Sequence, residues 1–364
     1  MLYYNMDPII EEKVTLIKAR LQEIMGADVL EKIVATRPLK VYWGTAPTGR
    51  IHIGYLVALL KIADFLKAGC QVKVLIADLH AVLDNMKSTS ELVGYRSQYY
   101  ELMIKSVLKN LGVSLDQLTF VKGTDYQLTS NYTMDMYKMS AISSVRNAKK
   151  AGAEVVKQSD NPMMSSLLYP ILQALDEQYL DTDAFFGGID QRRIATFASD
   201  MLPTLGYKKR IRLLNPMLIA INAKPKSIDD TDDNIADTKM SSSDINSKID
   251  LLDSKNTIKK KINRAYCLEK DLTFNPLMDL VKLVIYPMLN NSGIDAFVIN
   301  RQEKFGGPLS YASYALLEAD FVTGVVHPLD LKSGIIECID AFLEPIRQEF
   351  DSVEYKALLN KAYP

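Results

Sequence analysis

Residues 39–55 read Leu-Lys-Val-Tyr-Trp-Gly-Thr-Ala-Pro-Thr-Gly-Arg-Ile-His-Ile-Gly-Tyr. Residues 41–43 have the β-branched and aromatic character of a buried strand. The six residues after them include two Gly and one Pro, which predict a tight turn, and a helix should follow from about Ile51. The start of that helix would offer free backbone N–H groups and a positive dipole end to a phosphate, and Gly54 would let a nucleotide approach closely.

The spacing in this turn matches neither the Rossmann dinucleotide fingerprint nor the P-loop lysine motif. A second polar stretch, Lys239-Met240-Ser241-Ser242-Ser243, comes much later and is by itself typical of a solvated loop. In this order, however, residues 47–54 and 239–243 resemble the two signature sequences of class I aminoacyl-tRNA synthetases. Further matches make nearly the whole chain similar to the tyrosyl-tRNA synthetases of the archaeal and eukaryotic branch.

The resemblance implies an α/β fold: a Rossmann-like catalytic domain with a parallel five-stranded sheet and a helical connective insertion, followed by an all-α anticodon-binding domain. The expected boundaries are 1–38 for an N-terminal helical segment, 39–247 for the catalytic domain and 248–364 for the anticodon-binding domain. Within the catalytic domain, the insertion spans about 90–162 and a KMSKS-type loop spans 222–247. The run 72–77, apolar except for Lys73, supports this fold, because it is typical of a strand buried on both faces of a parallel sheet.

Composition limits the partners and the compartment. The chain has 364 residues, 48% of them hydrophobic, so two domains are expected. Because its formal charge is only −1, any RNA must be held by local basic clusters. The longest clusters lie at 208–212 and 255–264, and each is more often a solvated face. Three scattered Cys indicate reduced thiols without a zinc spacing. Neither an apolar run of membrane length nor a signal pattern is present, so a cytoplasmic protein is expected.

Three polar residues share one face of the helix predicted over 163–180. Tyr169, Gln173 and Asp176 are spaced by four and then three residues, between apolar neighbours. The spacing alone fits an exposed polar stripe as well as a binding face. The resemblance implies that these three hold substrate tyrosine, with Tyr42 beside Asp176 at the hydroxyl and Gln191 at the α-amino end.

The implied reaction is activation of tyrosine by ATP to tyrosyl-adenylate and pyrophosphate, then transfer of tyrosine to the 3′ end of tRNA(Tyr). Catalytic roles fall on His52, a neutral or cationic donor, and on Gly54, Lys239, Ser241 and Ser242. The ATP-binding residues implied are Gly44, Thr45, Pro47, His52, Gly54, Tyr55, Lys239 and Met240. Mg²⁺ should arrive on the ATP phosphates, and no carboxylate cage for a protein-bound metal is visible. The acidic stretch 229–238 is expected to be mobile until ATP closes it over the site.

The resemblance also implies contacts with tRNA and with a second copy of the chain. Arg192 would meet the tRNA acceptor end, Phe305 and His327 would stack the first anticodon base, and Asp330 would accept from guanine. Gly306 and His327-Pro328 fit ordinary helix caps equally well. The insertion would form a homodimer, and its contact residues would be Tyr132, Met134, Met136, Tyr137 and Met139, although such residues are more often internal packing.

Two residues after the run 72–77 are site candidates by position alone. Asp78 and His80 follow a strand end, where ligands bind in such sheets, but the apolar neighbours of His80 favour a satisfied core imidazole. Two other functions stay open. A tryptophanyl-tRNA synthetase has similar signatures, but an indole needs no carboxylate such as Asp176. A catalytically inactive tRNA-binding relative is disfavoured by the intact His52 and Lys239.

Overall fold

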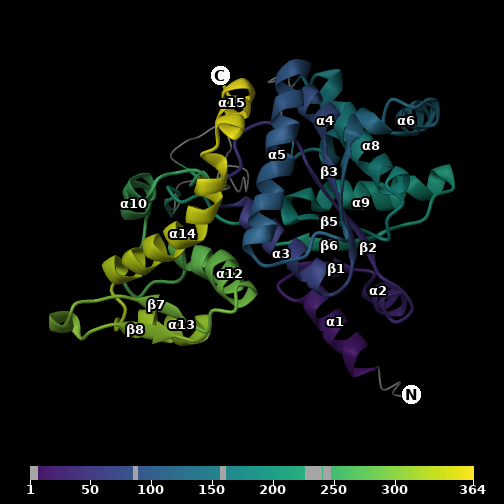
Figure 1. Cartoon of the computed structure of the whole chain (residues 1–364). Coiled ribbons are helices and arrows are strands. Elements are labelled where there is room, and N and C mark those ends of the chain that lie inside the picture. Colours follow the sequence, from purple (N-terminus) through teal and green to yellow (C-terminus); the bar gives the residue numbers. More distant parts are fainter. Residues whose placement is uncertain (1–6, 85–88, 156–160, 226–239, 241–246) are drawn as a thin grey trace.

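The computed structural model describes residues 7–84, 89–155, 161–225, 240 and 247–364. Its main feature is a six-stranded sheet in the order β1-β6-β5-β2-β3-β4 (Figure 1). The parallel strands are β2 (Lys40–Thr45), β3 (Gln71–Ile76), β4 (Leu118–Lys122), β5 (Ala184–Gly188) and β6 (Ile211–Asn215). The expected count of five is wrong by one, because β1 (Glu23–Met25) pairs antiparallel with β6 and adds a strand from the segment expected to be helical.

Alternating side chains of β2 bind helices to both faces of the sheet. Val41 and Trp43 belong to the core shared with α3 (Tyr55–Lys67) and α5 (Ser90–Asn110). Tyr42 points to the opposite face. There it packs in a cluster that includes one residue next to α8 (Met164–Tyr179) and another residue within α9 (Arg192–Met201). Because successive strand residues point to opposite faces, one apolar strand can serve both layers.

Helix α3 begins at Tyr55, four residues later than the sequence predicts. The backbone of the preceding residues is already used, since the Ile53 N–H donates to the Ile249 carbonyl at 2.8 Å and the Leu251 N–H donates to the Ile51 carbonyl at 3.3 Å. Ile51 and Ile53 are fully buried in this pairing. The turn after β2 is therefore tied to residues 249–251 before the helix starts.

Part of the expected insertion 90–162 belongs to the sheet. β4 pairs with β3, and α5 is the crossover helix that connects these two strands. The helices that follow β4 are α6 (Ser130–Ile142) and α7 (Val145–Ala151). Helix α6 lies beside α8 at the outer side of the sheet domain (Figure 1), and α7 packs on α8 and α9.

The C-terminal part is mostly helical but differs from the expected all-α domain. It contains a β-hairpin, β7 (Phe297–Ile299) with β8 (Leu309–Tyr311). Gly334 lets α14 (Pro328–Phe350) approach this hairpin, because a Cβ there would lie 2.9 Å from the Phe297 ring. The helices of this part are α10 (Lys255–Arg264), α11 (Pro276–Leu280), α12 (Tyr286–Asn291), α13 (Tyr314–Thr323), α14 (Pro328–Phe350) and α15 (Val353–Ala362). The remaining helices of the described chain are α1 (Pro8–Lys18), α2 (Ala27–Val34) and α4 (Asp78–Leu83).

Helices α14 and α15 return along α5, so the C-terminus lies beside the sheet domain (Figure 1). The Asn110 amide donates to the Phe342 carbonyl at 2.8 Å, and the Tyr99 ring lies 6.0 Å from the Phe350 ring. One apolar core consequently runs from the sheet into the C-terminal helices. All three cysteines are free thiols, as expected. None of the described helices has the length and apolarity that a membrane crossing requires.

Candidate active site

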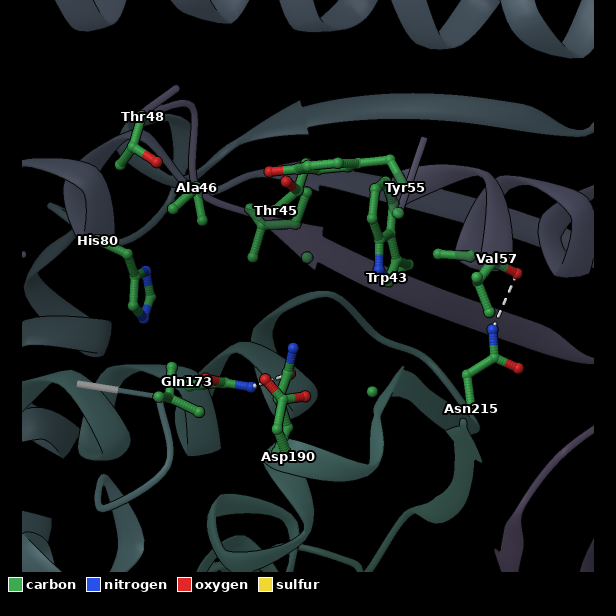
Figure 2. A pocket seen from close by; sticks show the side chains of 18 of the residues that line it. Trp43, Thr45, Ala46, Thr48, Tyr55, Val57, His80, Gln173, Asp190 and Asn215 are labelled. Atoms are coloured by element: carbon green, nitrogen blue, oxygen red, sulfur yellow. Dashed lines mark hydrogen bonds between the residues drawn. The ribbon is translucent and has the colours of Figure 1, made fainter. Parts of the chain in front are cut away.

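A pocket of about 680 Å³ opens at the carboxyl ends of β2, β3, β5 and β6. The strand order reverses between β2 and β5, and ligands bind outside the strand ends at such a switch point. Figure 2 shows Thr45 and Thr48 on one side of the space, Gln173 and Asp190 on the other, and His80 projecting into it. The pocket brings together Tyr42, Gly44, Thr45, His52, Gly54, Tyr55, Tyr169, Gln173, Asp176, Gln191 and Met240. Pro47 and Arg192 do not line it.

The deep end of the pocket contains two buried oxygens without a hydrogen bond, Asp176 Oδ2 and Tyr42 Oη. Both side chains are at most 1% exposed. Burial raises the pKa of the Asp176 carboxyl, and burial followed by the charges of Glu177 and Asp176 raises the pKa of the Tyr42 phenol. An unpaired buried oxygen costs free energy, so this end is suited to a ligand group that can pair both atoms.

The other oxygen of Asp176 is held by neighbouring donors that the sequence did not indicate. Oδ1 accepts from Tyr126 Oη at 2.7 Å and from Gln127 Nε2 at 2.7 Å, and the single proton of Tyr132 Oη is shared between Oδ1 and the Leu172 carbonyl, each at 2.9 Å. Tyr132, considered for a dimer contact, is 1% exposed and belongs to this buried network. These bonds hold the carboxylate through Oδ1 and leave Oδ2 without a hydrogen bond.

His80 is a pocket residue, and the interpretation as a satisfied core imidazole is wrong. Neither ring nitrogen has a hydrogen bond, and Nε2 lies 3.9 Å from Asp176 Oδ2. Burial lowers the pKa of the ring, which favours the neutral form, and its edge packs against Tyr169 at 4.6 Å. Asp78 has a structural role instead, because its two oxygens accept from Leu79 N and from the backbone and hydroxyl of Thr124.

A buried ion pair holds the helices that carry the pocket residues. Arg212 Nη1 lies 2.7 Å from Glu177 Oε2, and both side chains are at most 2% exposed. The same guanidinium donates to the Ala195 carbonyl and to Ser199 Oγ on α9. Arg212 therefore joins α8 and α9 to β6, and it does not belong to the solvated basic cluster expected at 208–212.

Two amides meet at the middle of the pocket. Gln173 Nε2 donates to Gln191 Oε1 at 2.8 Å, which joins α8 to the turn after β5. Tyr169, Gln173 and Asp176 all line the pocket from α8. The polar face formed by these three residues therefore lines a cavity and is not an exposed surface.

The shallow end of the pocket is formed by the turn after β2 and the first turn of α3. His52 is 5% exposed, and its Nδ1 accepts from the Gly54 N–H at 3.2 Å. Burial and the charge of Lys248 lower the pKa of His52 to about 3. His52 is therefore neutral near pH 7, and because Nδ1 accepts, its proton is on Nε2. This excludes the cationic donor that the sequence left open.

Gly54 makes room for protein atoms as well as for any ligand. A Cβ at this position would lie 3.0 Å from His52 Cε1 and 3.5 Å from Met240 Sδ. Met240, 9% exposed, thus brings the second signature stretch against the first. Lys239, Ser241 and Ser242, and the acidic stretch 229–238, lie outside the described residues.

The residues expected to contact tRNA lie away from the pocket. Arg192 pairs with Glu23 at 2.7 Å at the surface. Phe305 is 62% exposed, His327 caps α14 by accepting from the Leu329 N–H, and Asp330 lies 3.6 Å from Arg301. Gly306 has a positive φ of 95° after its 3₁₀ turn, so both cap interpretations describe the local structure.

The α6–α7 region carries many exposed apolar side chains. Met134 and Tyr137 are 55% and 61% exposed, whereas Met139 is fully buried. The other exposed members nearby are Leu128, Ile142, Val145, Met163 and Met164. Exposed apolar patches of this kind mark interaction surfaces.

Comparisons with known proteins agree with this geometry. The sequence profile described as "tRNA synthetases class I (W and Y)" matches residues 34–344. The chain is 49% identical over 354 residues to the cytoplasmic tyrosine–tRNA ligase of Gallus gallus, covering 97% of this chain but only 64% of the relative. The corresponding Saccharomyces cerevisiae protein is 47% identical, with 99% and 89% covered. The crystal structure of tyrosyl-tRNA synthetase complexed with L-tyrosine from Archaeoglobus fulgidus superposes with a TM-score of 0.81 and 34% identity, covering 93% of this chain and 99% of that one.

Proposed function

The chain belongs to the class I tRNA synthetases, in their tyrosyl branch, and we propose that it activates L-tyrosine with ATP and transfers it to tRNA(Tyr). The observation that carries the proposal is the pair of unpaired buried oxygens, Tyr42 Oη and Asp176 Oδ2, at the deep end of the pocket. A phenol hydroxyl donates one hydrogen bond and accepts others, so it can donate to the carboxylate and accept from Tyr42. An indole N–H only donates and would leave Tyr42 unpaired, which favours tyrosine over tryptophan.

The rest of the substrate would follow the pocket outward. The α-amino group of tyrosine would bind Tyr169, Gln173 and Gln191, which line the middle of the pocket. ATP would bind at the shallow end, along Gly44, Thr45, Gly54, Tyr55 and Met240. The free N–H groups expected there from the sequence are already used, because those of residues 54–56 donate to His52 Nδ1, the His52 carbonyl and the Ile53 carbonyl. Pro47, outside the lining, would act by shaping this turn.

In the proposed reaction a tyrosine carboxylate oxygen attacks the α-phosphorus of ATP. The bond to that phosphorus forms as the bond to the bridging oxygen of the leaving pyrophosphate breaks. His52 can donate from Nε2 without bringing a positive charge. Charge on the pyrophosphate would be balanced by Lys239, with Ser241 and Ser242 nearby in sequence. In the second step a ribose hydroxyl at the tRNA 3′ end attacks the tyrosyl carbonyl carbon, and AMP leaves.

Mg²⁺ would enter as part of the MgATP substrate. Within the described residues no three His, Cys, Asp or Glu side chains gather in a way that could hold a metal ion. The donor set at the shallow end, made of backbone groups, hydroxyls and a neutral imidazole, suits phosphates more than a resident cation.

The wider assignments rest on the same family membership. Residues 39–247 would form the catalytic domain and 248–364 the anticodon-binding domain. Phe305, His327 and Asp330 would read the anticodon, and Arg192 would meet the acceptor end after leaving Glu23. The exposed apolar side chains of the α6–α7 region support a homodimer. The names of the relatives, which include the word cytoplasmic, support a location in the cytoplasm.

Exchange of pyrophosphate into ATP tests the proposed function directly. The assay compares tyrosine, tryptophan and no amino acid with the same chain. Exchange that requires tyrosine supports the proposal. Preference for tryptophan would assign the chain to the other member of the group, and a folded chain without exchange would be an inactive relative.

A further inference from the structure

The carbonyl of Gly49, in the pocket-lining turn after β2, receives two phenol hydroxyls from other parts of the chain. Tyr100 Oη, on α5, donates to it at 2.7 Å. Tyr363 Oη, directly after α15, donates to it at 2.8 Å. Thr48 and Gly49 both line the shallow end of the pocket. The position of this carbonyl therefore depends on a residue at the other end of the sequence.

Tyr363 is itself held firmly in place. Its ring packs edge-on against Tyr99 at 5.4 Å, and the Arg96 guanidinium lies 5.0 Å above the ring. Arg96 Nε also donates to the Ala362 carbonyl at 2.9 Å, and Arg96 lines the pocket. Burial raises the pKa of the Tyr363 phenol, so the hydroxyl keeps its proton and donates at neutral pH.

The next residue of the turn is fixed from a third direction. Arg50 Nε lies 2.9 Å from Asp250 Oδ2, and Asp250 forms a backbone bridge with His52. The turn is thus anchored by α5, by residues 249–251 and by Tyr363. A turn with one anchor removed keeps its fold but samples more conformations. This weakens the binding of any ligand that requires a single conformation of the turn.

We propose that Tyr363 is a positioning residue for ATP, acting through the Gly49 carbonyl on the turn that forms the shallow end of the pocket. The inference rests on the proposed function only in taking ATP as the ligand of that end. Tyrosine bound at the deep end would lie on Tyr42 and Asp176, neither of which shares a hydrogen bond with Gly49 or Tyr363. ATP binding should therefore depend on the Tyr363 hydroxyl, and tyrosine binding should not.

The test is Tyr363→Phe, which removes the hydroxyl and keeps the ring on Tyr99 and Arg96. The matched control is Tyr355→Phe, which removes a phenol hydroxyl from α15 at a ring that packs on Phe350. Pyrophosphate exchange gives KM for ATP and for tyrosine, calorimetry gives the Kd for MgATP without amino acid, and thermal melting checks the fold.

The expected result is a rise of about fivefold in KM and Kd for ATP, the size of one neutral hydrogen bond, with KM for tyrosine unchanged and the melting temperature lowered by at most a few degrees. Tyr355→Phe should match the wild type. An unchanged ATP Kd in Tyr363→Phe, or equal rises for ATP and tyrosine, overturns the inference. If the wild type binds MgATP but shows no tyrosine-dependent exchange, the proposed function fails while the Kd comparison still tests Tyr363.

Discussion

Replacing Tyr42 by Phe should reduce the discrimination of tyrosine from phenylalanine. The change removes only the Tyr42 hydroxyl, which has no protein partner, and leaves the ring that packs 5.5 Å from Phe185. Stability should therefore change little. Asp176→Ala is a less clean perturbation, because it also removes the acceptor of Tyr126 Oη and Gln127 Nε2.

The size of the effect follows from the two amino acids taken separately. With tyrosine, the variant loses one neutral hydrogen bond of about 1 kcal/mol. With phenylalanine, little should change, because the Tyr42 hydroxyl is already buried and unpaired in the free protein. The ratio of kcat/KM values should therefore fall by about 1 kcal/mol, which is roughly fivefold at about 1.4 kcal/mol per tenfold.

The measurement is pyrophosphate exchange with each amino acid over a range of concentrations. Tyr55→Phe is the control, since it removes a hydroxyl at the shallow end of the same pocket, where Tyr55 meets Tyr100 at 3.2 Å. Tyr55→Phe should change the kcat/KM values for tyrosine and phenylalanine by the same factor. If the tyrosine-to-phenylalanine ratio of Tyr42→Phe stays within about threefold of wild type, below the roughly 1 kcal/mol of one hydrogen bond, Tyr42 does not read the hydroxyl.

Asp176→Ala should lower the free energy of unfolding by about 1–3 kcal/mol for each donor left without an acceptor, Tyr126 Oη and Gln127 Nε2, whereas Asp176→Asn should retain most of it; equal urea midpoints for the two variants would contradict this network. Because the pKa of His52 falls from 6.5 unfolded to about 3 folded, its neutral form is favoured in the fold, so stability should decrease as the pH falls from about 6.5 toward 3. His52→Gln should flatten that part of the curve in urea unfolding, and an unchanged slope would refute the burial argument. Phe305→Ala and Asp330→Ala should weaken tRNA charging while leaving pyrophosphate exchange intact; a parallel loss in both assays would mean that these residues act on stability. Tyr137→Glu should shift sedimentation toward the monomer, and an unchanged distribution would exclude this region from the dimer contact.

The stripe on α8 could be predicted because helical spacing is a local property. Tyr169, Gln173 and Asp176 share a face wherever that helix packs. What fixes Asp176 could not be predicted, since its donors come from residues 126–132, in another layer of the fold. The expectation that His80 is a satisfied core imidazole is wrong for a related reason. Apolar neighbours in sequence indicate burial, but they do not show whether a buried ring finds a hydrogen-bond partner.

The start of α3 shows the same limit for the shallow end of the pocket. The sequence after the turn predicts a helix from Ile51. Residues 51–53 instead pair with residues 249–251, and the helix begins at Tyr55. No local pattern can reveal a pairing across that distance in the sequence. The same pairing carries the Arg50–Asp250 ion pair and holds residues 249–251 beside the first signature stretch. Since Tyr363 adds a further anchor from the last residues, the shallow end is assembled only when the sheet domain and the C-terminal helices have folded together.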